Sequence, residues 1–231
     1  MMRETPRVVS LVLDVPGWAG HRPGQHVDVR LTAEDGYQAQ RSYSLAAPAE
    51  GERVVLTVEE LPDGEVSPFL AEELRPGDRF ELRGPIGGYF VWDGATEGPL
   101  QLVAGGSGVV PLMAMLRHRA AAAVDVPATL LYSSRTLEDV INREELDLLT
   151  EADRSLTVAH TLTRGQPDGW EGYARRIDGE MLSEVFGSPD GSATAFVCGP
   201  TRFVEVAADG LVGLGYDPSR VRTERFGPSG R

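Results

Sequence analysis

The run Leu102-Val-Ala-Gly-Gly-Ser-Gly-Val-Val-Pro111 decides the fold class of the second half of this 231-residue chain. An apolar stretch with the character of a buried strand passes into three glycines, Gly105, Gly106 and Gly108, and a helix is expected directly after them. Glycines permit a tight turn and close backbone approach, and the N-terminus of the following helix offers free N–H groups to a phosphate. By itself the run also fits an ordinary strand-to-helix turn, because Pro111 replaces the third glycine of a dinucleotide-binding fingerprint.

Strands and helices alternate through the whole second half of the chain. The expected strands cover residues 100–104, 128–133, 156–162, 193–198 and 220–226. The expected helices cover residues 110–122, 143–151, 179–186 and 202–214. Such alternation predicts a doubly wound sheet of parallel strands with right-handed crossovers, in which ligands bind at the carboxyl ends of the strands.

The first half consists instead of short strands and turns. Strands are expected over residues 8–15, 25–31, 38–45, 53–60 and 78–83. One short helix fits residues 67–74, with Ser67 as its N-cap and Pro68 at its first position. Such closely spaced strands predict a small antiparallel β-barrel. Residues 93–99 form the expected linker, so we predict a barrel domain over residues 1–96 and an α/β domain over residues 97–231.

The composition excludes several classes of protein. The net charge of −13 argues against broad binding to nucleic acids or anionic membranes. We expect no membrane span, because the longest apolar run falls well short of about eighteen residues. Residues 1–9 are charged and lack the apolar segment of a signal peptide, so a cytoplasmic location is expected.

The basic and metal-binding residues narrow the chemistry further. All 22 basic residues are arginines, so a phosphate must be bound by arginine, hydroxyl or backbone N–H groups, and a Schiff-base lysine is excluded. The single cysteine, Cys198, can neither form an internal disulfide nor hold an iron–sulfur cluster, which needs about four cysteines. We expect no metal site, since surface or hydrogen-bonded roles suit His21 and His26 better than metal ligation.

Polar residues follow the second and third expected strands of the α/β half. Ser133, Ser134 and Arg135 lie where a dinucleotide fold meets the adenosine ribose, and hydroxyls with a guanidinium suit a 2′-phosphate. An acidic residue at this position would instead favour a bare ribose. Arg164, after the third strand, is a second candidate phosphate contact. The alternative for Arg135 is a solvated loop arginine.

The fourth expected strand ends in Cys198-Gly199-Pro200, which faces the same edge of the sheet. A nucleophilic cysteine needs a nearby base, and no histidine lies close in the sequence. A buried, inert thiol is therefore an equally good interpretation of Cys198.

The barrel half carries two polar motifs of its own. In Arg41-Ser-Tyr-Ser44 a guanidinium, an aromatic ring and two hydroxyls alternate, so Arg41 and Tyr43 point to one face of the strand and Ser42 and Ser44 to the other. Gly64-Glu-Val-Ser67 opens the short helix and offers a second helix N-terminus to an anion.

The order of these motifs resembles that of the ferredoxin–NADP⁺ reductase family of flavoproteins. The resemblance covers nearly the whole chain, and the combination is specific although each motif alone is not. The motifs that carry it are Arg41-Ser-Tyr-Ser44, Gly64-Glu-Val-Ser67, Gly84-Pro-Ile-Gly87, Gly105-Gly-Ser-Gly108 through Pro111, Tyr132-Ser-Ser-Arg135 and Cys198-Gly-Pro200.

The resemblance implies a role for each matched residue. In the barrel, the Arg41–Ser44 strand and the turn of Gly64, Val66 and Ser67 would bind FAD: Arg41 at the diphosphate, Tyr43 against the isoalloxazine and Ser44 near its N5. In the α/β half, the nicotinamide dinucleotide would be held by Gly105, Gly106, Gly108, Pro111, Ser133, Ser134, Arg135, Arg164, Cys198, Gly199 and Pro200. Ser44, Cys198 and Glu224 would be the catalytic residues.

The C-terminal segment matches the family with one departure. Glu224 and Phe226 correspond to the segment that closes over the flavin. In this chain Gly227–Arg231 follow Phe226, so the aromatic residue is not the last one.

The resemblance implies an enzyme that passes hydride from NADPH to FAD and electrons onward to a separate protein, such as ferredoxin or an oxygenase component. NADH is the other possible donor. The same residues would also serve a reductase of free flavin, ferric chelates or quinone. A non-catalytic flavin-binding subunit of a larger oxidoreductase is an alternative of another class, but it would not need the glycine-rich run or Arg135.

Overall fold

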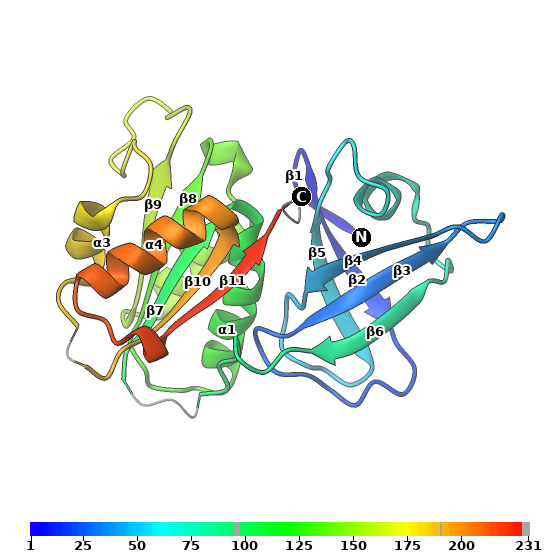
Figure 1. Ribbon diagram of the computed structural model, residues 1–231, viewed down its shortest axis with the longest axis horizontal. Coiled ribbons are helices and arrows are strands. Elements are labelled where there is room, and N and C mark those ends of the chain that lie inside the picture. Colours follow the sequence, from blue (N-terminus) through cyan, green and yellow to red (C-terminus); the bar gives the residue numbers. More distant parts are fainter. Residues whose placement is uncertain (95–97, 190, 228–231) are drawn as a thin grey trace.

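The computed structural model describes residues 1–94, 98–189 and 191–227, which form two lobes side by side (Figure 1). We call them the β lobe, which contains strands β1 to β6, and the α/β lobe, which contains strands β7 to β11. The central residues 95–97 of the predicted linker over residues 93–99 lie outside the described part of the chain. No helix in the described residues is long and apolar enough to cross a membrane.

The β lobe consists of two antiparallel three-stranded sheets, ordered β1-β2-β5 and β4-β3-β6. An isolated bridge between Leu45 and Leu56 connects them at one edge. Alternating residues such as Val27 and Val29 are fully buried in the core between the sheets, as the sequence pattern requires. The strands are β1 (Met2–Thr5), β2 (Val8–Asp14), β3 (His26–Thr32), β4 (Gln38–Ser44), β5 (Arg53–Glu59) and β6 (Glu81–Ile86).

Three elements of the β lobe differ from expectation. The strand expected over residues 78–83 lies three residues later, as β6. The sequence does not predict β1, because its four residues are too short and too mixed to show an alternating pattern; it forms by pairing with β2. The helix expected over residues 67–74 is present over residues 67–73 and includes the turn Phe69–Glu73. Ser67 is not its N-cap, because no side chain caps this turn.

The α/β lobe is a five-stranded parallel sheet in the order β11-β10-β7-β8-β9, as the alternation of strands and helices predicts. Two hydrophobic clusters cover its faces, one around α1 and α2 and the other around α3 and α4. The elements are β7 (Leu100–Gly105), α1 (Val109–Ala121), β8 (Ala128–Ser134), α2 (Arg143–Ala152), β9 (Leu156–Leu162), α3 (Gly179–Phe186), β10 (Thr194–Pro200), α4 (Thr201–Gly213) and β11 (Val221–Phe226).

The strand order places a topological switch point between β7 and β10. From β7 the chain proceeds outward to β8 and β9, and it then returns to the other side of β7 with β10. Ligands of such sheets bind at the carboxyl ends of the strands beside this point. In this chain the two ends carry Gly105 and Gly199.

Polar contacts hold β11 and its neighbours against the β lobe. The hydroxyl of Tyr89 donates to the carbonyl of Val221 at 3.2 Å, and the Arg222 guanidinium donates to the carbonyl of Val91 at 2.8 Å. The same guanidinium lies 5.4 Å from the centroid of the Phe196 ring. These contacts direct the end of β11 toward the junction of the lobes (Figure 1).

Candidate dinucleotide and flavin sites

The glycines at the switch point are required by packing between the two strand ends. A Cβ added at Gly108 would lie 2.1 Å from the carbonyl oxygen of Cys198, and one at Gly105 would lie 2.8 Å from the Phe203 ring. Gly106 has a φ of +55° and has open space where a Cβ would stand. The turn therefore brings its backbone close to β10 and leaves Gly106 open.

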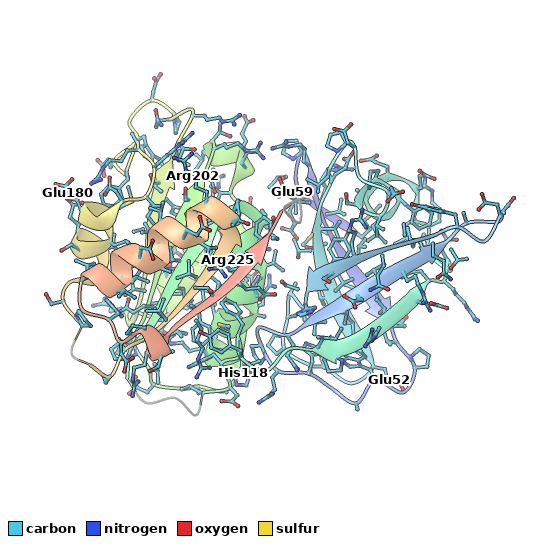
Figure 2. The ribbon with its side chains drawn as sticks, viewed as in Figure 1. Glu52, Glu59, His118, Glu180, Arg202 and Arg225 are labelled. Carbon is cyan, nitrogen blue, oxygen red and sulfur yellow. The ribbon has the colours of Figure 1, made fainter. Side chains whose placement is uncertain are left out.

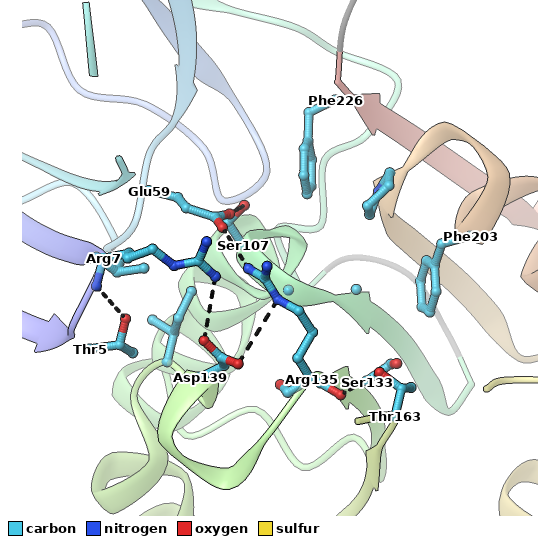
Figure 3. Close-up of a pocket in the computed structure, with 16 residues that line it drawn as sticks. Thr5, Arg7, Glu59, Ser107, Ser133, Arg135, Asp139, Thr163, Phe203 and Phe226 are labelled. Atoms are coloured by element: carbon cyan, nitrogen blue, oxygen red, sulfur yellow. Dashed lines mark hydrogen bonds and ion pairs between the residues drawn. The ribbon is translucent and has the colours of Figure 1, made fainter. Parts of the chain in front are cut away.

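A cavity of about 250 Å³ opens beside this turn, where the two lobes meet (Figure 3). Both lobes contribute to its wall, so it is a site between lobes and not a groove of the α/β lobe alone. Its lining residues are Thr5, Arg7, Val8, Glu59, Gly105, Gly106, Ser107, Ser133, Ser134, Arg135, Asp139, Ile141, Thr163, Pro200, Phe203 and Phe226.

A chain of charged groups crosses this cavity. The Ser107 hydroxyl donates to Glu59 at 2.8 Å, and the Arg135 guanidinium donates to the other carboxylate oxygen of Glu59 at 3.3 Å. Arg135 also lies 3.9 Å from a carboxylate oxygen of Asp139, which in turn lies 3.6 Å from the guanidinium of Arg7 (Figure 3). Arg135 is therefore ion-paired, although more than a third of its side chain remains exposed.

Sequence reasoning did not identify Glu59, Arg7 or Asp139 as site residues. Glu59 ends β5, and Arg7 lies between β1 and β2, so both reach the cavity from the β lobe. No sequence signal connects either residue with Arg135, because only the packing of the two lobes brings them together.

Some of the predicted dinucleotide-binding residues line the cavity, and others do not. Ser133 and Ser134 line the cavity with Arg135. Arg164 is exposed and does not line it, although its backbone N–H donates to the Arg135 carbonyl at 2.8 Å. Pro111 is buried in the first turn of α1.

In the β lobe, Arg41 and the turn at residues 64–67 lie together, as the motifs predict. The Arg41 guanidinium lies 3.3 Å from the carboxylate of Glu65. The side chains of Val66 and Ser67 serve the lobe itself: Val66 is fully buried in the core, and the Ser67 hydroxyl accepts from the N–H of Leu61 at 3.0 Å.

In the pairing of β3 with β4, alternate side chains of β4 point to opposite faces of the sheet. Tyr43 lies opposite the buried Val27, and burial raises the pKa of its phenol to about 12, an effect that the nearby Arg41 charge partly offsets. Ser42 belongs to the other face, where its hydroxyl donates to Asp28 at 2.6 Å.

Ser44 lies on that second face, directly opposite His26 in the strand register. The His26 ring nitrogen Nδ1 is 3.7 Å from a carboxylate oxygen of Glu224 in β11. Burial raises the pKa of Glu224 from 4.5 to about 7. His26 therefore lies opposite Ser44 in the strand register and faces Glu224 from the other lobe, although the sequence did not identify it as part of the site.

Cys198 is paired with Glu224 in the parallel register of β10 and β11. Its side chain is only 2% exposed and belongs to the core beneath α1. Burial, and secondarily the charge of Glu224, raise the pKa of the thiol well above its ordinary value. The thiol is thus held protonated, which favours the buried alternative over a nucleophile. Phe226, two residues after Glu224, lies beside Pro200 and lines the cavity.

Comparison with known proteins assigns the family. The model of the oxidoreductase FAD-binding domain matches residues 6–91, and the model of the oxidoreductase NAD-binding domain matches residues 102–209. A ferredoxin–NADP reductase B of Sorangium cellulosum is 33% identical over 208 residues, which are 88% of this chain and 84% of that protein. The chain belongs to the ferredoxin–NADP⁺ reductase-like family. It contains an FAD-binding and an NAD-binding oxidoreductase domain.

Other members of this family agree with the fold. A glycine betaine monooxygenase reductase subunit of Chromohalobacter salexigens is 32% identical over 225 residues; they cover 96% of this chain but 60% of that protein. The chain thus spans less than two thirds of the length of such relatives. The solved FAD/NAD-binding domain of a Vibrio cholerae nitric oxide dioxygenase superposes with a TM-score of 0.86 at 26% identity, covering 98% of this chain and 95% of that domain.

The residues present fit the two dinucleotides that the family uses. In the α/β lobe, the cavity is lined by the hydroxyl of Ser107 and the guanidinium of Arg135, and such donors suit phosphate oxygens. In the β lobe, a guanidinium faces the turn at residues 64–67, and Tyr43 offers an aromatic surface on the same strand.

Proposed function

We propose that this chain passes hydride from NADPH to FAD and passes electrons onward to a separate protein acceptor, either a ferredoxin or an oxygenase component. The observation that supports this most is the cavity between the lobes. Its wall joins the glycine-rich turn and Arg135 of the α/β lobe to residues of the β lobe and to Phe226, so a nicotinamide dinucleotide there would reach the β lobe.

Arg135 would distinguish NADPH from NADH in this proposal. Its planar guanidinium can bind a 2′-phosphate with two parallel hydrogen bonds, and Ser133 and Ser134 would add hydroxyl donors. The glycine-rich turn, with Ser107, would hold the pyrophosphate at the start of α1. Arg164 and Pro111 would contribute only through the backbone they support.

FAD would lie along β4 and the turn at residues 64–67. Arg41 would bind the diphosphate, Tyr43 would support the flavin ring, and Ser44 would donate its hydroxyl near the ring nitrogen N5. We place the boundary between the FAD-binding and NAD-binding domains after residue 96, in the segment between the two matched family domains.

The reacting groups would meet beside β11. Bound FAD supplies the two-electron acceptor that can release electrons one at a time. Glu224, with its raised pKa, would hold a proton near neutral pH and exchange it at the junction of the lobes, and His26 would orient its carboxyl group. Cys198 and Gly199 would form the wall beside the nicotinamide, and Phe226 would cover the cavity.

The kind of acceptor is proposed from the relatives. The similar proteins include a reductase subunit of glycine betaine monooxygenase and a ferredoxin–NADP reductase. Both names describe enzymes that deliver electrons to another protein. A reductase of free flavin, ferric chelates or quinone would use the same site and differ only in the acceptor.

The test is rapid-mixing reduction of the purified flavoprotein by NADPH and by NADH, followed by a screen of acceptors. We expect a yellow protein with one FAD per chain that is bleached faster by NADPH and reoxidised fastest by a ferredoxin or an oxygenase component. Reoxidation fastest by free flavin, a ferric chelate or quinone would overturn the proposed acceptor. A protein that binds flavin but is bleached by neither dinucleotide would be a non-catalytic subunit.

A further inference from the structure

The carboxylate of Glu59 contacts two groups of the cavity, the Ser107 hydroxyl and the Arg135 guanidinium, that would otherwise be free to donate hydrogen bonds to a cofactor phosphate. Glu59 accepts the Ser107 hydroxyl with one oxygen at 2.8 Å and faces Arg135 with the other at 3.3 Å. Glu59 comes from β5 in the β lobe, whereas both donors belong to the α/β lobe. Figure 2 shows Glu59 where the two lobes meet.

The surroundings strengthen this contact beyond that of a surface ion pair. The Glu59 side chain is 23% exposed and that of Arg135 is 37% exposed, so solvent screens their attraction only in part. A carboxylate resembles a phosphate in charge and in accepting hydrogen bonds from hydroxyl and guanidinium groups. Arg7 and Asp139 form a second ion pair across the lobes at 3.6 Å, next to the first.

We propose that Glu59 is an internal competitor of the dinucleotide phosphates, which lowers the affinity for the cofactor and holds the two lobes together until the cofactor binds. A phosphate that takes Ser107 and Arg135 must displace the carboxylate or lie beside it, and either costs affinity. The cost is larger for a dinucleotide with a 2′-phosphate, since that group needs Arg135. This inference rests on the proposed dinucleotide site and adds a residue of the β lobe to it.

The test compares Glu59→Gln with wild type, both loaded with FAD, by calorimetric titration with the non-reducing cofactors NADP⁺ and NAD⁺. The amide keeps the size of the side chain and removes its charge. We expect NADP⁺ to bind roughly fivefold to tenfold more tightly to the variant, which is less than the effect of a full charge-assisted hydrogen bond because solvent partly screens Glu59 and Arg135. The affinity for NAD⁺ should increase less than the affinity for NADP⁺. High salt should reduce the difference between variant and wild type.

The matched control is Glu60→Gln, which removes the same charge one residue away, outside the set of side chains that line the cavity. It should bind both dinucleotides as wild type does. Equal or weaker binding of NADP⁺ by Glu59→Gln, with its melting temperature and FAD content unchanged, would overturn the proposal. An equal increase in the affinity of Glu60→Gln for NADP⁺ would also overturn it, because the change in net charge alone would then explain the effect.

Combining Glu59→Gln with Arg135→Ala separates this inference from the proposed role of Arg135. If both are right, the gain from Glu59→Gln becomes smaller in the Arg135→Ala background. If Arg135 does not bind a 2′-phosphate, Arg135→Ala alone weakens NADP⁺ and NAD⁺ equally. In that case Glu59→Gln must still tighten both dinucleotides through Ser107 for Glu59 to be a competitor.

Discussion

Each lobe contains an arginine that faces a glutamate at 3.3 Å, yet the two pairs differ in what they connect. Arg41 and Glu65 both belong to the β lobe, and about half of each side chain is exposed. Arg135 and Glu59 belong to different lobes and are more enclosed. A phosphate at Arg41 therefore competes with a local, screened contact, whereas a phosphate at Arg135 competes with a contact that also joins the lobes.

The difference indicates where cofactor binding is coupled to the arrangement of the whole molecule. In the proposed arrangement, FAD would bind along β4 without any change between the lobes. The nicotinamide dinucleotide would enter a cavity whose walls come from both lobes, so its binding and the contacts between the lobes would affect one another. This is consistent with a flavin that stays bound while the dinucleotide enters and leaves in each cycle.

The largest effect is expected for Arg135→Ala. The catalytic efficiency with NADPH should fall about 10- to 150-fold, the range for losing one charge-assisted contact, and the efficiency with NADH should stay nearly unchanged. Steady-state kinetics with both donors measure the ratio. Arg164→Ala is the matched control, since Arg164 is exposed and does not line the cavity.

Two outcomes would contradict the proposed role of Arg135. The wild type could already prefer NADH, or the variant could lose NADPH and NADH equally. Either result would make Arg135 a general contact of the dinucleotide or a link between the lobes, and the cross-lobe pair would then have no part in cofactor choice.

Glu224→Gln probes the other cross-lobe pair, the one with His26. Its carboxyl has a pKa of about 7 in the folded chain and ionises near 4.5 when unfolded. The stability from its protonated form is fully present below about pH 4.5 and is lost as the pH rises through about 7. Between these pH values the free energy of unfolding of wild type should fall by about 2 to 3 kcal/mol more than that of the variant.

Urea unfolding of both proteins at several pH values measures this effect, and turnover with the reductive half-reaction measures the catalytic role. We expect slower turnover in Glu224→Gln because the amide cannot exchange a proton. If the free energies of unfolding of wild type and variant change equally with pH, and turnover and flavin reduction are unchanged, Glu224 is not part of the site.

Arg41→Ala probes the local pair. Its dissociation constant for FAD should rise roughly fivefold to tenfold, a smaller loss than at Arg135 because the guanidinium is more exposed. Fluorescence titration of the apoprotein with FAD provides the measurement. Arg30→Ala, which removes another exposed arginine of the same sheet paired with Glu81, is the control. Full FAD occupancy of Arg41→Ala at low protein concentration would show that Arg41 does not bind the diphosphate.

The smallest effect is expected for Cys198→Ala. We predict a severalfold slower reduction of the flavin by NADPH, with a loss of stability of about 1 kcal/mol for the small cavity. Rapid-mixing reduction and thermal unfolding distinguish the two roles of this residue. An unchanged reduction rate with a larger loss of stability would leave Cys198 as a packing residue of the core beneath α1.

Much of the fold was predictable because it follows from local patterns. The glycine-rich run at residues 102–111 and the alternation of strands and helices identify the parallel sheet. The alternating strands of the first half predict the antiparallel lobe. Among the strands of the described residues, β1 was missed, since its four residues form a strand through pairing with β2 and not through a pattern of their own.

The sequence by itself determined the two lobes and the family. It also placed Arg41 on a polar strand, and the glycine-rich turn and Arg135 at the ends of strands. Tertiary structure alone decided which carboxylates face these groups: Glu59 at Arg135, and Glu224 at His26. Each of these pairs joins residues that are more than seventy positions apart and lie in different lobes. Sequence periodicity reports the environment along one element, whereas a cross-lobe contact depends on how two finished elements pack.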